Sequence, residues 1–319
     1  MPRSRRVVVT LVALAALLAV PALSLTAGQP FYIDLFTRIM VFAIAALSLD
    51  LILGYGGMVS FGHAAYLGIG AYAVGMLSFH GIGNGFVHFG VAILASALTA
   101  LVIGFISLRT SGVHFIMITL AFAQMLYFLA ESLNLYGGDD GLNIARASSF
   151  GGSIDLGDPV ERYYFVFLWL LAFLYLGHRL VHSRFGLLLQ GVKSNERRMA
   201  AIGFPTLRYK LAGFVIAGTV CGVAGALYAN ALLFVSPSIM HWTRSGEIMM
   251  MVILGGMATL TGPVLGAALY LILESVLPRA TEHWQAILGP ILVLVVLFSK
   301  SGLLGLLADG VKRRSGARA

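Results

Sequence analysis

Residues 38–79 have the sequence RIMVFAIAALSLDLILGYGGMVSFGHAAYLGIGAYAVGMLSF, and this stretch decides the fold. Its only Asp, Glu, Lys or Arg side chains are Arg38 and Asp50, and its two apolar runs, 38–54 and 60–79, flank a glycine-rich break. An apolar run of about 20 residues is long enough to cross a bilayer as a helix. The stretch therefore predicts two membrane-spanning helices separated by an interruption.

The rest of the chain has the same character. Of its 319 residues, 59% are hydrophobic and 11% are charged, whereas soluble domains carry about 25% charged residues. This composition excludes a soluble globular protein and a disordered one. We predict an all-α, polytopic helical membrane protein that forms a single domain over 1–319. About ten transmembrane helices are expected, at 7–27, 38–54, 60–79, 87–108, 113–131, 163–181, 211–234, 246–261, 263–278 and 285–300.

Two of these predictions have alternatives. The first segment has a basic start, an apolar middle and small residues at its end, so it is either an uncleaved first helix, which its length favours, or a secretory signal. The segments 246–261 and 263–278 are short and are separated only by Gly262. They are either two full spans or a broken, re-entrant pair.

The distribution of Lys and Arg predicts the orientation. If the N-terminus is cytoplasmic, fifteen of these residues fall in inner segments and five in outer ones. Cytoplasmic loops are enriched in Lys and Arg, so both termini are expected in the cytoplasm. The segment 132–162 is then an external loop, and the segment 182–210 is cytoplasmic. The net charge of +8 is explained by these segment ends, so we expect no nucleic-acid partner.

The inner segment 182–210 contains a pattern for a short helix. Ser194 can cap it, Glu196 lies in its first turn, and Gly203 ends it, which predicts a helix over Asn195–Ile202. Such a helix is about 12 Å long, far too short to cross a membrane.

The side chains of this short helix suggest two roles. Met199 lies on the same face as Ile202, and Arg197 and Arg198 lie beside them. The helix either rests on anionic membrane lipid or inserts into a cytosolic partner.

Ionisable and glycine residues inside the apolar segments suggest a translocation path. A carboxylate near the centre of a membrane costs about 2.5–3.5 kcal/mol, so the acidic residues in these segments need a partner, water or the interface. They are either structural groups or ion relays of a secondary transporter. Glycine breaks near them can mark a central pathway. Our candidates for the path or gate are Asp50, Gly57, His63, Glu247 and Gly256.

Motifs for catalysis and for ATP binding are absent. The chain has no GxxxxGK[ST], so it cannot hold ATP in a P-loop by itself, and neither HExxH nor GxSxG occurs. Its single cysteine, Cys221, rules out a Cys-based metal cluster. We therefore expect neither an enzyme nor a cofactor.

Four motifs in order along the chain resemble one family. They are LSLDLILGYGGMVSFGHAAYLGIGAY (47–72), GGDDGLNI (137–144), RFGLLLQGVKSNERRMAAIGF with YKLAGFVIAGTVCGVAGALYA (184–204 and 209–229), and EIMMMVILGGMATLTGPVLGAAL (247–269). Together they are similar to the permease of branched-chain amino-acid ABC importers, the LivM type. The resemblance covers roughly residues 40–300.

The resemblance implies one half of an importer of the bacterial inner membrane. The expected partners are two cytosolic ATP-binding subunits, a sister permease of the LivH type and an external substrate-binding protein. The family's coupling segment falls on 184–204, where Arg184, Gly186, Glu196 and Gly203 match recurrent positions and Met199 would lie in the ATPase cleft. The other predicted coupling residues are Ser194, Arg197 and Arg198.

Two positions depart from the family pattern. Asp50 stands where relatives commonly have Asn, and Met257-Ala258 replaces a more usual Leu-Gly. Related permeases also transport urea and short amides, so these solutes are the alternative to a branched-chain amino acid.

Overall fold

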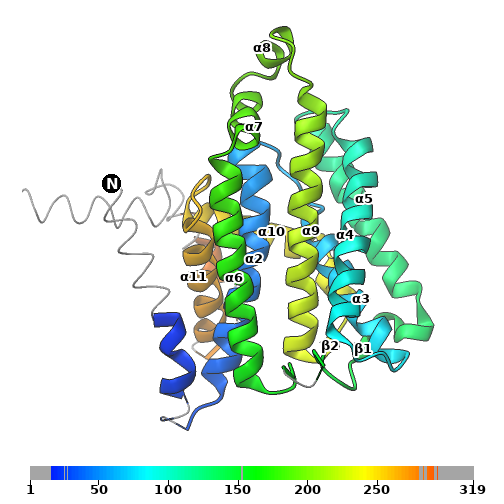
Figure 1. The fold of residues 1–319 in the computed structure, drawn as a ribbon, viewed down its shortest axis with the longest axis vertical. Helices are drawn as coiled ribbons and strands as arrows, with labels where there is room; N and C mark the ends of the chain where they lie inside the picture. Colours follow the sequence, from blue (N-terminus) through cyan, green and yellow to red (C-terminus); the bar gives the residue numbers. More distant parts are fainter. Residues whose placement is uncertain are drawn as a thin grey trace, which may run out of the picture.

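The structure is a bundle of helices (Figure 1). This computed structural model describes residues 16–24, 26, 28–151, 154–279, 283, 286–290 and 293. The principal helices are α2 (Phe31–Asp50), α3 (His63–Phe79), α4 (Gly85–Ser107), α5 (Val113–Ser132), α6 (Pro159–Val181), α7 (Arg184–Ser194), α8 (Glu196–Ala201), α9 (Thr206–Leu232), α10 (Trp242–Gly255) and α11 (Gly262–Val276). The π-helix η1 (Leu51–Tyr55) prolongs α2, and the short elements are η2 (Asn134–Tyr136), η3 (Gly138–Asp140), η4 (Pro237–Met240), η5 (Leu277–Arg279), β1 (Leu142–Asn143) and β2 (Phe234–Val235). The predicted all-α class is confirmed.

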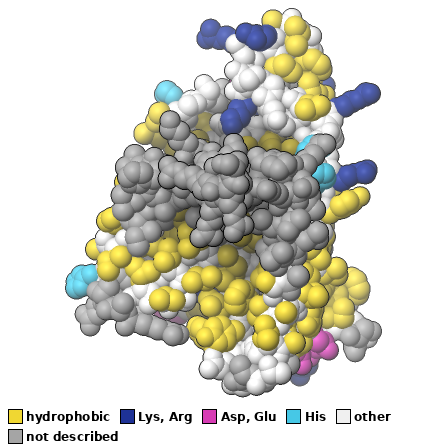
Figure 2. Space-filling model, turned by 90° about the vertical axis from the view of Figure 1, so that its left-hand side faces the viewer, with side chains coloured by type: hydrophobic (Ala, Val, Ile, Leu, Met, Phe, Trp, Pro, Cys, Tyr) yellow, Lys and Arg dark blue, Asp and Glu magenta, His cyan; other side chains and the backbone are white. Residues whose placement is uncertain are grey.

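Five of the described helices are long and apolar enough to span a membrane. They are Phe31–Tyr55, Gly85–Ser107, Val113–Ser132, Pro159–Val181 and Thr206–Leu232, while His63–Phe79 and Gly262–Val276 are apolar but shorter. On the face shown in Figure 2, hydrophobic side chains cover much of the described surface in the lower half, and Lys and Arg gather toward the upper end. Following the predicted orientation, we call the end that carries α7 and α8 the inner end. The opposite end, which carries β1 and β2, is the outer end.

The helix α2 lies at the centre of one half of the bundle and is enclosed by α6, α9, α10 and α11. Its most apolar window is 78% buried, against 22% for that of α6. An apolar helix in a membrane can be covered by lipid as well as by other helices, so apolar character alone does not explain this burial. The helix α2 also carries Arg38 and Asp50, and charged side chains within a membrane face a partner or a water-filled cavity, which favours a position among other helices.

The helices α3 and α9 approach each other closely because both carry glycines. A Cβ atom at Gly70 would overlap the carbonyl oxygen of Gly222, and one at Gly225 would overlap that of Leu67. Small residues at helix contacts of this kind let backbones approach within membranes.

The outer end is an ordered cap. β1 pairs antiparallel with β2, and the Asn230 side chain of α9 accepts a hydrogen bond of 2.7 Å from the backbone N–H of Ser148. The predicted external loop 132–162 thus corresponds to residues 133–158 in the structure, because α6 begins at Pro159, where Asp158 caps it.

Several predicted boundaries were wrong by more than three residues. The second span was predicted from residue 38, but α2 begins at Phe31, because Asp34 and Arg38 lie inside the helix and pair with Arg162 and Glu274. The eighth was predicted over 246–261, but α10 is Trp242–Gly255, since Gly256 has φ 112° and ends it. The segment 7–27 is described only in part, and ten of the sixteen residues of 285–300 lie outside the described residues.

Candidate functional site

The helices α7 and α8 project from the inner end as a pair (Figure 1). Asn195 separates them in an extended conformation, and its side chain accepts a hydrogen bond of 2.9 Å from the backbone N–H of Arg198. Asn195 is therefore the cap of α8. The prediction that Ser194 caps it was wrong, because Ser194 is the last residue of α7 and its hydroxyl donates to the carbonyl of Gly191.

The C-terminal end of α8 is a Schellman motif. The N–H of Gly203 donates to the carbonyl of Ala200, and that of Phe204 donates to the carbonyl of Met199. Gly203 has φ 92°, a left-handed conformation that glycine adopts without strain. The geometry explains why a glycine stands at this position.

One side of α8 contacts the neighbouring helices, which we call the held side, and the other is exposed, which we call the free side. Lys210 of α9 is only 7% exposed and binds both carboxylate oxygens of Glu196, at 3.0 and 3.1 Å. Met199 packs its side chain over Gly191 of α7. The free side carries Arg197 and Arg198, which form no ion pair among the described residues.

Exposed apolar side chains follow these arginines in the sequence. Ile202 was predicted to share a face with Met199, but the exposed side chains next to Ile202 are Phe204 and Leu207. No periodic pattern in the sequence indicates these two, because they follow the turn at Gly203 and lie on different elements. We call Arg197, Arg198, Ile202, Phe204 and Leu207 the α8 tip.

The α7–α8 pair is connected to the membrane helices through Lys193. Its ammonium donates a hydrogen bond of 2.5 Å to the carbonyl of Gly54 in η1. Gly57, with φ 69°, leaves room for the lysine, because a Cβ there would lie 2.8 Å from its Cγ. At the start of α7, Arg184 is the first helical residue and Ser183 accepts from the N–H of Gly186. Gly186 has no room for a side chain against the end of α6.

One turn before Gly54, Asp50 joins α2 to the loop between α10 and α11. Its side chain is 1% exposed and accepts a hydrogen bond of 2.8 Å from the backbone N–H of Ala258. Gly54 must be small, since a Cβ there would overlap the Asp50 carboxylate. The two positions at which the sequence departs from the family pattern are thus in direct contact.

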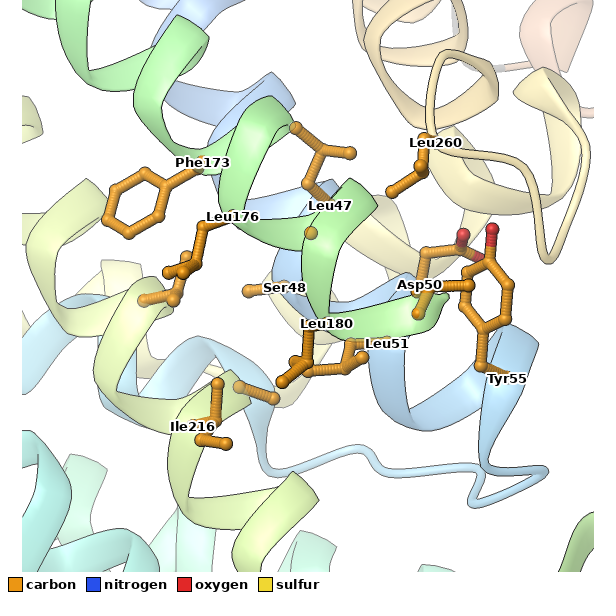
Figure 3. A pocket seen from close by; sticks show the side chains of 14 residues that line it. Leu47, Ser48, Asp50, Leu51, Tyr55, Phe173, Leu176, Leu180, Ile216 and Leu260 are labelled. Carbon is orange, nitrogen blue, oxygen red and sulfur yellow. The ribbon is translucent and has the colours of Figure 1, made fainter. Parts of the chain in front are cut away.

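The pocket next to Asp50 is small and mostly apolar (Figure 3). It has a volume of about 40 Å³ and is lined by residues of α2, α6 and α9, with Ser48 and Asp50 among its few polar groups. A cavity needs about 10–15 Å³ of space by this measure to hold one water molecule. This pocket therefore cannot hold an amino acid in the conformation described.

The other two predicted path residues differ in their relation to this pocket. His63 is fully buried, and its Nε2 is 2.7 Å from the hydroxyl of Ser48, which lines the pocket. Glu247 is paired with Arg244 within α10 at 2.6 Å. The structure thus connects Asp50 with Gly57 and the Gly256 loop, places His63 behind Ser48 of the pocket, and holds Glu247 in a separate ion pair. No group of three His, Cys, Asp or Glu residues in the described part of the chain could hold a metal ion.

Comparison with known proteins identifies the family. The family model described as "Branched-chain amino acid transport system / permease component" matches residues 31–297. The chain belongs to this family. It is 28% identical to the high-affinity branched-chain amino acid transport system permease proteins LivM of Escherichia coli, over 94% of this chain and 77% of the relative, and of Salmonella typhimurium, over 89% and 72%.

Two further relatives of this chain are slightly less similar, and their names give different solutes. The chain is 26% identical to a probable branched-chain amino acid transport permease protein LivM of Methanocaldococcus jannaschii, over 85% of this chain and 94% of the relative. It is 27% identical to the L-arabinose ABC transporter permease protein AraH of Azospirillum brasilense, over 65% and 62%. No solved structure matches the chain significantly. Membership in a permease family agrees with the prediction that the chain is a transport protein.

Proposed function

We propose that this chain is a transmembrane permease subunit of an ABC importer for branched-chain amino acids in a bacterial inner membrane. Two cytosolic ATP-binding subunits, a sister permease of the LivH type and an external binding protein complete the transporter. Family membership supports this assignment, and the chain's lack of a P-loop requires ATP to be bound elsewhere.

One observation carries the mechanism: the α7–α8 pair is exposed at its tip and hydrogen-bonded to the membrane helices at its base. The α8 tip offers two free guanidinium groups beside apolar side chains, a combination typical of a protein interface. The bond from Lys193 to Gly54 leads from α7 to η1, and Asp50 leads from there to the loop at Ala258. Movement of α7–α8 by an ATPase subunit would thereby shift α2 relative to α10 and α11.

The carboxylates fit an ATP-driven permease better than an ion relay. Asp50 accepts from a backbone N–H, Glu247 pairs with Arg244, and Glu274 pairs with Arg38. Protonation of Glu247 or Glu274 would leave its arginine partner as an unpaired charge, and protonation of Asp50 would weaken the bond that it accepts from the backbone.

Reconstitution of the whole transporter tests the proposal. Proteoliposomes that contain both permeases and both ATPase subunits, with the binding protein outside, are expected to concentrate radiolabelled leucine only when ATP is supplied inside. Urea, acetamide and L-arabinose serve as comparison solutes. Leucine accumulation driven by a proton or sodium gradient without ATP would overturn the ABC assignment, and transport of urea or acetamide in place of leucine would overturn the substrate.

A further inference from the structure

The helix α8 is joined to its neighbours by two non-helical links. Asn195, with φ −163° and ψ 97°, separates it from α7, and residues 202–205 separate it from α9. It has six residues, none of which is buried. So short a helix is not stable by itself. Its direction relative to the membrane helices therefore depends on the contacts that its side chains make.

The strongest of these contacts is an ion pair with α9. The ammonium of Lys210 lies 3.0 and 3.1 Å from the two carboxylate oxygens of Glu196, the first residue of α8. Among the described residues, no other carboxylate pairs with this ammonium. The second contact, of Met199 with Gly191, joins α8 to α7 and is apolar. The ion pair is thus what holds α8 to α9.

The two members of this pair differ in exposure. The side chain of Lys210 is 9% exposed and that of Glu196 is 44% exposed. If α8 turned away, Glu196 would gain contact with water, but Lys210 would keep a buried charge without a partner. Loss of one partner from a buried pair is strongly destabilising. The burial of Lys210 therefore opposes movement of α8 away from α9.

The helix α9 connects this contact to the rest of the molecule. It has 27 residues and is about 40 Å long. A Cβ atom at Gly222 would overlap the Ser96 side chain of α4, so the two helices pack without space between them. At the outer end of α9, Asn230 accepts the bond from Ser148 of the outer cap. Movement that reaches α9 is therefore passed to α4 and to the outer cap.

We propose that Glu196 acts within the chain: its ion pair with Lys210 makes α8 and α9 move as one unit when an ATPase subunit moves the α8 tip. The resemblance places Glu196 in the coupling segment, where a direct contact with the ATPase subunit is the alternative role. Lys210 is then a positioning residue for coupling. This inference rests on the proposed function and adds a connection to α9 beside the one from Lys193 to η1.

Exchange of the two charges tests whether they act on each other. In the reconstituted transporter, Glu196→Lys and Lys210→Glu each bring like charges together, and each should lower the leucine transported per ATP on the order of tenfold. The double variant restores a pair of opposite charges and should return this ratio to within about twofold of the parent. A lysine at position 196 would remain unsuitable for an ATPase contact, so rescue distinguishes the two roles.

A neutral pair of variants gives the same test without a buried glutamate at position 210. Lys210→Met and Glu196→Gln should each lower the leucine transported per ATP by about three- to tenfold, because either one removes the charge-assisted contact. The double variant should be no lower than the worse single variant, since one interaction can be lost only once. Arg208→Gln is the control, because Arg208 is exposed on the opposite side of α9 from Lys210.

The orientation of α8 can be measured without transport. Ala200 is exposed on α8 and the native Cys221 is buried, so a nitroxide spin label on Ala200→Cys reports on α8 in the full chain in lipid nanodiscs. Lys210→Met should shift this label to faster motion. A label on Leu187→Cys is the control, because Leu187 is 62% exposed on α7 and α7 is held through Lys193. Its motion should not change.

The results separate this inference from the proposed function. Absence of rescue by charge exchange, or additive losses in the neutral pair, would show that Glu196 and Lys210 act separately and would overturn the inference. Unchanged motion of the label on α8 in Lys210→Met would do the same. Loss of ATPase subunits from the purified Lys210→Met complex would show that the pair serves assembly and not coupling. If the parent transporter does not move leucine with ATP, the proposed function is contradicted, and the spin label still decides whether the pair holds α8.

Discussion

Asp50 is held by the backbone of a loop 208 residues further along the chain. The sequence identified it as a carboxylate in an apolar segment that required a stabilising partner. It could not identify the partner, because the bond comes from the N–H of Ala258 and a backbone N–H has no signature in sequence. The same is true of the Gly54 carbonyl that Lys193 binds.

Replacing Asp50 tests the bond to the α10–α11 loop. Asp50→Ala removes the acceptor of the Ala258 N–H, so we expect a loss of about 1 kcal/mol of stability. Asp50→Asn keeps an acceptor oxygen and should lose less than half as much. Thermal unfolding of the purified chain in detergent measures both. A loss in Asp50→Asn equal to that in Asp50→Ala would show that the hydrogen bond is not what stabilises this position.

Ala258 has φ 58°, a left-handed conformation that is unfavourable for an alanine. Ala258→Gly should remove this strain and raise stability by about 0.5–1 kcal/mol, after allowance for the greater entropy of glycine in the unfolded chain. Ala268→Gly, in the middle of α11, is the control and should lower stability by a similar amount. Thermal unfolding in detergent measures both variants. A lower stability of the Ala258→Gly protein than of the unsubstituted protein would contradict this prediction.

At the scale of elements, α8 presents its arginines to a partner. We expect the double substitution Arg197→Glu with Arg198→Glu to lower leucine uptake by on the order of tenfold or more, since like charges at an interface cost several kcal/mol. The amount of protein in the membrane should not change, because both side chains are exposed. Arg179→Glu, at the exposed end of α6, is the control. Normal uptake by the double variant would contradict the coupling role of α8.

Substitution of Lys193, in the neighbouring helix α7, provides a second test of the coupling role. Lys193→Met keeps most of the length of the side chain but cannot donate to Gly54. We expect ATP hydrolysis to continue while the leucine transported per ATP falls about tenfold, because the charge-assisted hydrogen bond that connects α7 to η1 is lost. Ser194→Ala, beside it, should have no such effect. If both activities fall together, Lys193 serves assembly and not transmission.

Sequence patterns located helices better than their ends. The segments 113–131 and 60–79 agree with α5 and α3 to within three residues, because glycines or polar residues flank their apolar runs. The predicted start of α2 is seven residues too late, since Asp34 and Arg38 interrupt the apolar run in the sequence but lie inside the helix. Glycine did indicate both breaks correctly, at η1 and at Gly256.

For the whole molecule, the charge distribution predicts which end faces the cytoplasm. Cysteine substitutions can test this, because Cys221 is buried. An impermeant thiol reagent added to spheroplasts should modify Asp139→Cys at the outer end and leave Ser194→Cys unmodified until the membrane is opened. Both residues are exposed, so the comparison depends on side and not on burial. Modification of the Ser194→Cys variant alone in closed spheroplasts would reverse the assigned orientation.

The central position of α2 has a consequence for how the protein is made. Nearly all the helices that enclose α2 are synthesised after it, and Glu274 is 236 residues beyond Arg38. At about 5–20 residues per second, the ribosome needs on the order of 10–50 seconds to supply this carboxylate. During that interval the arginine of the nascent chain must be sheltered by the insertion machinery or by water. A chain that ends before residue 274 therefore leaves Arg38 without the carboxylate that neutralises it in the folded protein.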